Sequence, residues 1–157
     1  MAEIFTIVCE NVNVSAPQDL LAAYAASTKK LQLLGVEIGV NGQTTVGNYP
    51  IRMKYLTTTV TAGSGGASVT PHNVNPDGAA AGFTARRNDV TQAVTSGSAI
   101  DFVATQLNPI NGYYWTPPGT VQPGDEPKAD ASGAIILSLD AVTGTLGISA
   151  TMWLREI

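Results

Sequence analysis

The sequence of 157 residues contains a single cysteine, Cys9, and a single histidine, His72. One cysteine cannot form an internal disulfide, so we expect synthesis in a reducing compartment. A zinc site needs three or four Cys, His or carboxylate ligands at defined spacings, which these two residues do not supply. Cys9 ends the apolar run that starts at Phe5, and a buried structural cysteine is therefore favoured over a nucleophile paired with His72. We expect no metal, no cofactor and no enzyme activity.

Charged residues are also scarce. They make up 13% of the sequence, compared with about 25% in an average soluble domain. The net charge of -4 provides no basic field for phosphate backbones, which argues against nucleic acid as a direct partner. With so few ionic side chains, much of the surface must consist of neutral residues. Such a surface suits burial against neighbouring proteins.

Long apolar runs are missing as well. No stretch approaches the roughly 18 apolar residues of a membrane span, and Met1 to Glu10 lacks the features of a secretory signal. We therefore expect neither a membrane partner nor secretion. The 16 glycines and 9 prolines exceed average usage but stay below the level of disordered chains. This composition indicates a folded chain with many turns.

Alternation of apolar and polar residues is the dominant pattern. At the C-terminus one face would carry Leu146, Ile148, Ala150, Met152 and Leu154, and the other Gly147, Ser149, Thr151, Trp153 and Arg155. Such alternation is typical of a half-buried strand. Residues 51–57 alternate in the same way, which places Ile51, Met53 and Tyr55 inside and Arg52 and Lys54 outside.

The alternation changes phase once, within Lys30 to Val40. Leu31 and Leu33 share one face, and Leu34, Val36, Ile38 and Val40 then take it over. A β-bulge near Leu34 and Gly35 would restore the register. Further strands are predicted at Ile4 to Val14, Ala99 to Leu107, Gly112 to Trp115 and Ala134 to Asp140.

Short strands separated by frequent turns predict an all-β sandwich or barrel. We expect one domain over residues 1–157, a single antiparallel β-sandwich of about eight strands that resembles a jelly roll. Two long loops are expected, Thr61 to Asn88 and Thr116 to Ser132. The first contains Gly63 to Gly66, which lack the Lys-Ser/Thr ending of a phosphate-binding loop. Helix propensity favours one short helix over Asp19 to Ala26, although sheet context can override propensity.

Two short segments are candidates for contact with a partner. Tyr113, Tyr114 and Trp115 are consecutive on a predicted strand, so their rings must point alternately to opposite faces and at least one ring should be exposed or covered by another chain. Arg86 and Arg87 form the only adjacent arginine pair. They are either surface charge at a strand end or a forked contact to a carboxylate of a partner.

Several stretches resemble the capsid decoration proteins, or cement proteins, of tailed bacteriophages. They are Glu10 to Leu20, Gly63 to Pro71, Ala80 to Ala85, Trp115 to Pro118 and Gly147 to Glu156. Leu20 to Ala26 departs from the family in being richer in alanine. The resemblance rests on scaffold and turn residues, so no binding residue is carried over. It implies a β-sandwich that forms a homotrimer on the outside of an icosahedral head and bridges major capsid subunits.

These expectations define two hypotheses. In the first, the chain is synthesised in the host cytoplasm and becomes a structural virion protein on the capsid exterior, with the major capsid protein and its own copies as partners. In the second, it is a trimeric phage tail or adhesion module that binds host glycan through exposed aromatic rings. In the first hypothesis we expect Arg86, Arg87, Tyr113 and Trp115 to be contact residues, and in the second the exposed rings act together with polar groups of the loops.

Overall fold

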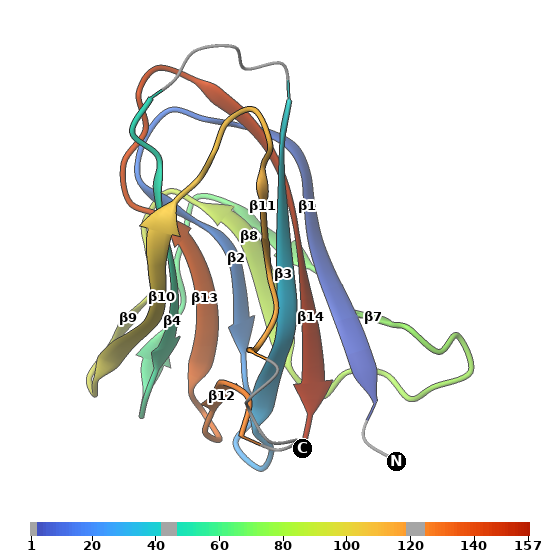
Figure 1. Ribbon diagram of the computed structural model, residues 1–157. Coiled ribbons are helices and arrows are strands. Elements are labelled where there is room, and N and C mark those ends of the chain that lie inside the picture. Colours follow the sequence, from blue (N-terminus) through green and yellow to red (C-terminus); the bar gives the residue numbers. More distant parts are fainter. Residues whose placement is uncertain (1–2, 42–46, 119–124) are drawn as a thin grey trace.

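The computed structural model describes residues 3–41, 47–118 and 125–157 of the chain. Figure 1 shows two sheets packed face to face. Sheet A contains, in order, β11 (Tyr113–Trp115), β3 (Leu31–Asn41), β14 (Leu146–Glu156), β1 (Ile4–Val14) and β7 (His72–Asn73), while β12 (Lys128–Ala129) pairs with another part of β3. All of these pairs are antiparallel.

Sheet B is likewise antiparallel and six-stranded. It contains, in order, β10 (Ala99–Gln106), β4 (Pro50–Leu56), β13 (Ala134–Leu139), β2 (Gln18–Tyr24), β8 (Thr84–Asp89) and β6 (Ala67–Val69). Two short strands, β5 (Val60–Thr61) and β9 (Val94–Thr95), form a small separate sheet. The predicted all-β antiparallel sandwich is confirmed.

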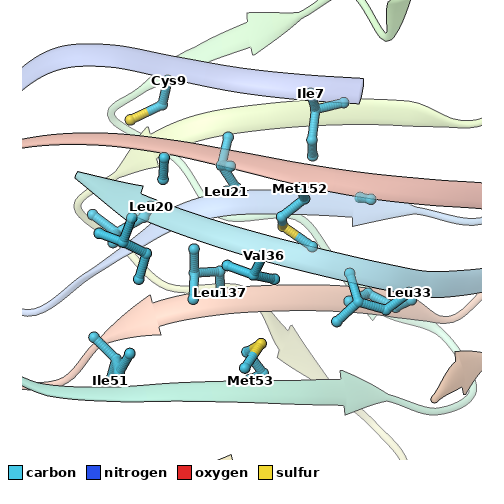
Figure 2. Packing of buried hydrophobic residues seen from close by; sticks show 14 of the residues in the cluster. Ile7, Cys9, Leu20, Leu21, Leu33, Val36, Ile51, Met53, Leu137 and Met152 are labelled. Carbon is cyan, nitrogen blue, oxygen red and sulfur yellow. The ribbon is translucent and has the colours of Figure 1, made fainter. Parts of the chain in front are cut away.

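The main hydrophobic core lies between the two sheets. Figure 2 shows Ile7, Val36 and Met152 of sheet A pointing toward Leu21 and Leu137 of sheet B. Each of these side chains is fully buried. Burial of one such side chain stabilises the fold by roughly 1.5–3 kcal/mol, so the shared core is what holds the sheets together.

The predicted bulge in β3 is confirmed. Trp153 of β14 pairs with Gly35, whereas the next residue, Leu154, pairs with Leu33, which leaves Leu34 without a partner across the ladder. The extra residue lets Leu33 and Val36 both face the core. The alternation predicted for residues 51–55 also holds, since Ile51 and Met53 are buried and Arg52 is exposed.

The helix predicted over Asp19 to Ala26 is wrong, because Gln18–Tyr24 form the strand β2. This strand lies between β13 and β8, so neighbouring strands supply the hydrogen bonds that a helix would have made internally. Its first six residues are all buried. Leu21 and Ala23 face the main core while Ala22 belongs to a second cluster on the other face of the sheet. Burial on both faces outweighs the helix propensity of the leucines and alanines.

The first predicted long loop is partly wrong. Residues 61–88 contain β6, β7 and most of β8. Strand β8 was missed because its sequence, Thr84 to Asp89, is mostly polar and has little apolar alternation. In the second predicted loop, residues 119–124 lie outside the described part of the chain, and Lys128–Ala129 form β12.

Candidate interaction surface

The outer face of sheet A is the first candidate surface. Three rows of outward positions on this face are Thr6, Trp153 and Gly35; Val8, Thr151, Glu37 and Tyr114; and Ser149 with Gly39. We call these nine residues the A face. Glu37 is the one ionic side chain among the nine, and the next row carries Arg155 of β14, opposite Ile4.

Two aromatic rings shape the A face. The Tyr114 side chain is 66% exposed, and that of Trp153 is half-buried. With Ile4, Leu34, Gly35 and Thr116 they line a groove of about 280 Å³. A Cβ atom added at Gly35 would lie 3.5 Å from the Trp153 ring, an ordinary contact distance, and 3.3 Å from the backbone oxygen of Trp115.

The outer face of sheet B is different because the chain itself covers part of it, although Arg52 and Asp101 on the same face remain accessible to solvent. Residues 57–66 and 90–98, which include β5 and β9, form this cover. Ala93 packs with Ala22, Leu56, Ala134 and Ile136 in a second buried cluster, and Val60 packs against that cluster. No comparable second layer of buried apolar residues lies on the A face within residues 3–41, 47–118 and 125–157.

Backbone hydrogen bonds attach the cover to sheet B. The amide N–H of Ala93 donates to Asp19 Oδ2 at 2.7 Å, and that of Gly66 donates to Asp89 Oδ1 at 3.0 Å. The Gly63 N–H donates to the Tyr24 hydroxyl at 3.2 Å. A buried carboxylate is costly unless it accepts hydrogen bonds, so these donors stabilise both the cover and the carboxylates beneath it.

Asp19 is the least well satisfied group under the cover. Its side chain is 1% exposed, and its Oδ1 atom has no hydrogen-bond partner among the described residues. Burial raises the pKa of this carboxyl to about 6, while the hydrogen bond from Ala93 acts in the opposite direction. Asp19 and Asp89 are cross-strand partners, and the negative charge of Asp89 adds to the increase in the pKa of Asp19.

The two predicted arginines lie side by side in β8 but face opposite ways. Arg86 lies on the outer face of sheet B and forms a forked pair with Asp89, with nitrogen-to-oxygen distances of 2.7 and 2.8 Å. Arg87 lies two residues after the buried Ala85 and therefore points toward the inside of the sandwich, where it is half-buried. Arg86 thus uses its fork on a carboxylate of its own chain, and contact of either arginine with a partner stays a prediction.

The predicted aromatic residues alternate as expected, and the exposed ring is Tyr114. Tyr113 and Trp115 are half-buried and pack against the main core. The Trp115 ring lies 5.9 Å from that of Phe102, which stacks at 5.7 Å on Tyr55. These rings join β11 of sheet A to β10 and β4 of sheet B. Contact of Tyr113 or Trp115 with a partner stays a prediction.

Trp153 and Tyr114 are surface residues that the sequence analysis did not select. A signal for Trp153 was present, because the C-terminal alternation placed it on the polar face with Gly147, Ser149 and Thr151. A large aromatic residue among small polar ones marks an outward ring. No comparable signal could decide whether Tyr114 or its two neighbours point outward, since all three are aromatic.

The described residues contain no group of three or more His, Cys, Asp or Glu side chains placed to hold a metal ion. Cys9 is buried, and burial raises the pKa of its thiol to about 11. A thiol with this pKa is protonated at neutral pH and is a poor nucleophile. Within the same described residues, no helix is long and apolar enough to cross a membrane.

No protein-family model matches the sequence, and no curated protein matches it. One similar solved structure is the crystal structure of the infectious bursal disease virus VP2 subviral particle. The likeness has a TM-score of 0.24 and 14% sequence identity, and it covers 99% of this chain and 42% of the other. This chain therefore spans less than half the length of that one, and a similarity this low does not bear on fold or function.

Proposed function

We propose that this chain is a structural virion protein that decorates the outside of a phage capsid and stabilises it by bridging major capsid subunits. The observation that supports this most is the contrast between the two outer faces. Part of one sheet is covered by its own chain, and the other presents the A face, where two aromatic rings lie among small residues with Glu37 as the one charge. Aromatic residues in a surface depleted of charge are typical of the centre of a protein interface.

The mechanism is mechanical. A copy that buries its A face against the shell adds contacts that must break before the shell subunits separate. Apolar area removed from water contributes roughly 25 cal/mol per Å² before the costs of association. A homotrimer would present three such faces at once, and linked contacts strengthen binding by roughly 10² to 10⁴-fold when their spacing matches the sites.

The edge of sheet B offers a contact for trimer formation. Strand β10 has a single strand partner, β4, in the described structure, so its other edge is unpaired. Its Ile100 side chain is 40% exposed. An unpaired edge strand with apolar side chains readily pairs with another chain. In a trimer the β10 edge would meet a different surface of the next copy, because two β10 edges that pair with each other close a twofold dimer. Contacts at this edge would leave the A face free for the shell.

The experiment is co-sedimentation of the purified protein with empty shells of its phage. We expect saturable binding and an affinity at least about 30-fold lower for Tyr114→Glu, as for loss of an interface hot spot. The matched control is Val94→Glu on the cover of sheet B, because Val94 is 60% exposed and also apolar. Equal loss in the two variants, or no saturable binding by the wild type, would refute the proposal.

A glycan-binding adhesion module is the second candidate, and the groove lined by Tyr114 and Trp153 is the observation that favours it. Aromatic faces in a shallow groove suit stacking against sugar rings. A glycan-array signal that is lost in Trp153→Ala, together with no binding to shells, would select this function. The opposite pattern, with binding to shells and no glycan signal, supports decoration.

A further inference from the structure

A hollow at the side of the sandwich contains ionic groups that the A face does not use. It has a volume of about 500 Å³ and is lined by Val8 and Glu10 of β1, Val69 of β6, Thr70, His72 of β7, and Arg87 of β8. The hollow thus joins an edge of sheet A to an edge of sheet B, where the chain crosses from β6 to β7. In Figure 1 the crossing segment is the green chain beside β1.

Arg87 differs from the other arginines in having no partner. Arg52 forms ion pairs with Asp101 and Asp140, Arg86 with Asp89, and Arg155 donates a hydrogen bond to Gln32. Among the residues that the structure describes, the guanidinium of Arg87 has no hydrogen bond or ion pair. It is nevertheless half-buried. A half-buried guanidinium without a protein partner has N–H donors free to bind an acceptor from outside the chain.

The chain does not supply this acceptor. Glu10 lines the same hollow, but no ion pair joins its carboxylate to Arg87. The residues outside the described ranges are 1–2, 42–46 and 119–124, and none of them has a carboxylate side chain. In the described structure the donors of Arg87 are therefore open to water or to an acceptor group of another molecule.

The lining of the hollow specifies the kind of acceptor. The planar fork of an arginine matches the two oxygens of a carboxylate. Glu10 is a negative charge in the same space and disfavours a doubly charged anion such as phosphate. Val8 and Val69 supply apolar walls for the methylene groups that precede a carboxylate, and the Thr70 hydroxyl can donate or accept.

We propose that this hollow binds a single carboxylate group, held by Arg87 and presented on a short aliphatic stem. The group can belong to a small carboxylic acid in solution or to a glutamate side chain of another protein. Arg87 pairs with the two oxygens, the valine side chains contact the stem, and Glu10 limits the site to one negative charge. This site shares only Val8 with the A face, and the proposal does not depend on binding of the A face to a shell.

The test is an NMR titration of the labelled protein with sodium propionate, at constant ionic strength set by sodium chloride. We expect saturable shifts of the Arg87 side-chain N–H and of the Val8 and Val69 methyl groups. Arg87→Gln should weaken binding by about tenfold or more through loss of a charge-assisted pair. Arg155→Gln is the matched control and should leave binding unchanged, because Arg155 does not line the hollow.

A second variant keeps the test decisive if Arg87→Gln does not fold. Glu10→Gln replaces an exposed side chain, and removal of its repulsion should strengthen propionate binding by about two- to fivefold. A titration with glutamate whose α-amino and α-carboxyl groups are both capped distinguishes the two sources of the carboxylate. Binding tighter than that of propionate indicates a protein side chain, and equal or weaker binding indicates a small free acid.

Three results would overturn the proposal. The first is a chemical-shift change that rises linearly with propionate concentration and does not saturate. A saturable change of the same affinity in Arg87→Gln would count equally against it. The second is tighter binding of inorganic phosphate than of propionate, which would contradict the limit to one charge. The third is no effect of Glu10→Gln on propionate binding, since that would show that Glu10 does not face the bound anion.

Discussion

The outer face of sheet B is partly covered by residues of its own chain, whereas the A face has no such layer among the described residues. Both faces come from strands of ordinary alternating sequence. On sheet B, buried carboxylates accept hydrogen bonds from the cover, and an ion pair joins Arg52 of β4 to Asp101 of the neighbouring β10. On the A face, small residues, Val8, Glu37 and two aromatic rings face outward. The difference separates a face that stabilises the protein from a face available to a partner.

The largest expected effect on stability distinguishes a glycine in the cover of sheet B from a glycine on the A face. A Cβ atom at Gly66, in the cover, would lie 2.0 Å from the backbone oxygen of Arg87, whereas one at Gly39, on the A face, would meet only Ser149 O at 3.9 Å. Gly66→Ala should therefore destabilise the protein by about 4 kcal/mol, beyond ordinary overpacking. Gly39→Ala should be neutral or stabilise by about 0.5–1 kcal/mol. Chemical denaturation of both variants measures the difference, and similar stabilities would contradict it.

The next largest effect on stability distinguishes Arg86 on sheet B from Arg155 on sheet A. Asp89 is 1% exposed, so Arg86→Ala leaves a buried carboxylate without its forked partner and should cost about 3–4 kcal/mol. Arg155→Ala removes only a 3.3 Å hydrogen bond to Gln32 and should cost less than about 1 kcal/mol. Urea unfolding at neutral pH tests both values. A cost for Arg86→Ala no greater than that for Arg155→Ala would show that the pair with Asp89 contributes little.

The third effect is a pH dependence that belongs to the covered face. The pKa of Asp19 is about 6 in the folded protein, compared with an ordinary value of 3.8. The folded state therefore binds this proton more tightly than the unfolded state, so the contribution of Asp19 to stability is highest below about pH 4 and is lost as the pH rises through 6. The full loss is up to about 3 kcal/mol.

The variant Asp19→Asn isolates this contribution. An asparagine cannot ionise, and its side-chain oxygen can still accept the hydrogen bond from Ala93. We expect the difference in unfolding free energy between wild type and variant to change between pH 4 and pH 7, in favour of the variant at the higher pH. A constant difference across this range would mean that Asp19 titrates alike in the folded and unfolded states.

The fold class was predictable from the sequence because alternation is a local property. Residues 146–154 and 51–55 alternate with the period of a strand, and the change of phase in Lys30 to Val40 placed the bulge at Leu34. Strands β2 and β8 were not predictable in this way. The sequence of β2 has no apolar–polar alternation because the strand is buried on both faces, so its residues favour a helix. The sequence of β8 is mostly polar, and its Arg86 pairs with Asp89.

The candidate surface was only partly predictable. The sequence indicated a neutral surface and an outward ring among residues 113–115, but Tyr114 was singled out by the pairing of β11 with β3. Trp153 was on the outward side of a correctly predicted strand. Arg86 and Arg87 look alike in the sequence, and the strand separates them into a partnered outward residue and an unpartnered inward one.

The sequence alone determined that the chain forms strands, which side chains of the regular strands are buried, and that few ionic groups remain for the surface. These properties depend on the spacing of neighbouring residues, which the backbone converts directly into sides of a strand. The tertiary structure decided which sheet is covered and which is open. That choice depends on where residues 57–66 and 90–98 pack, and contacts between segments far apart in the sequence leave no local pattern.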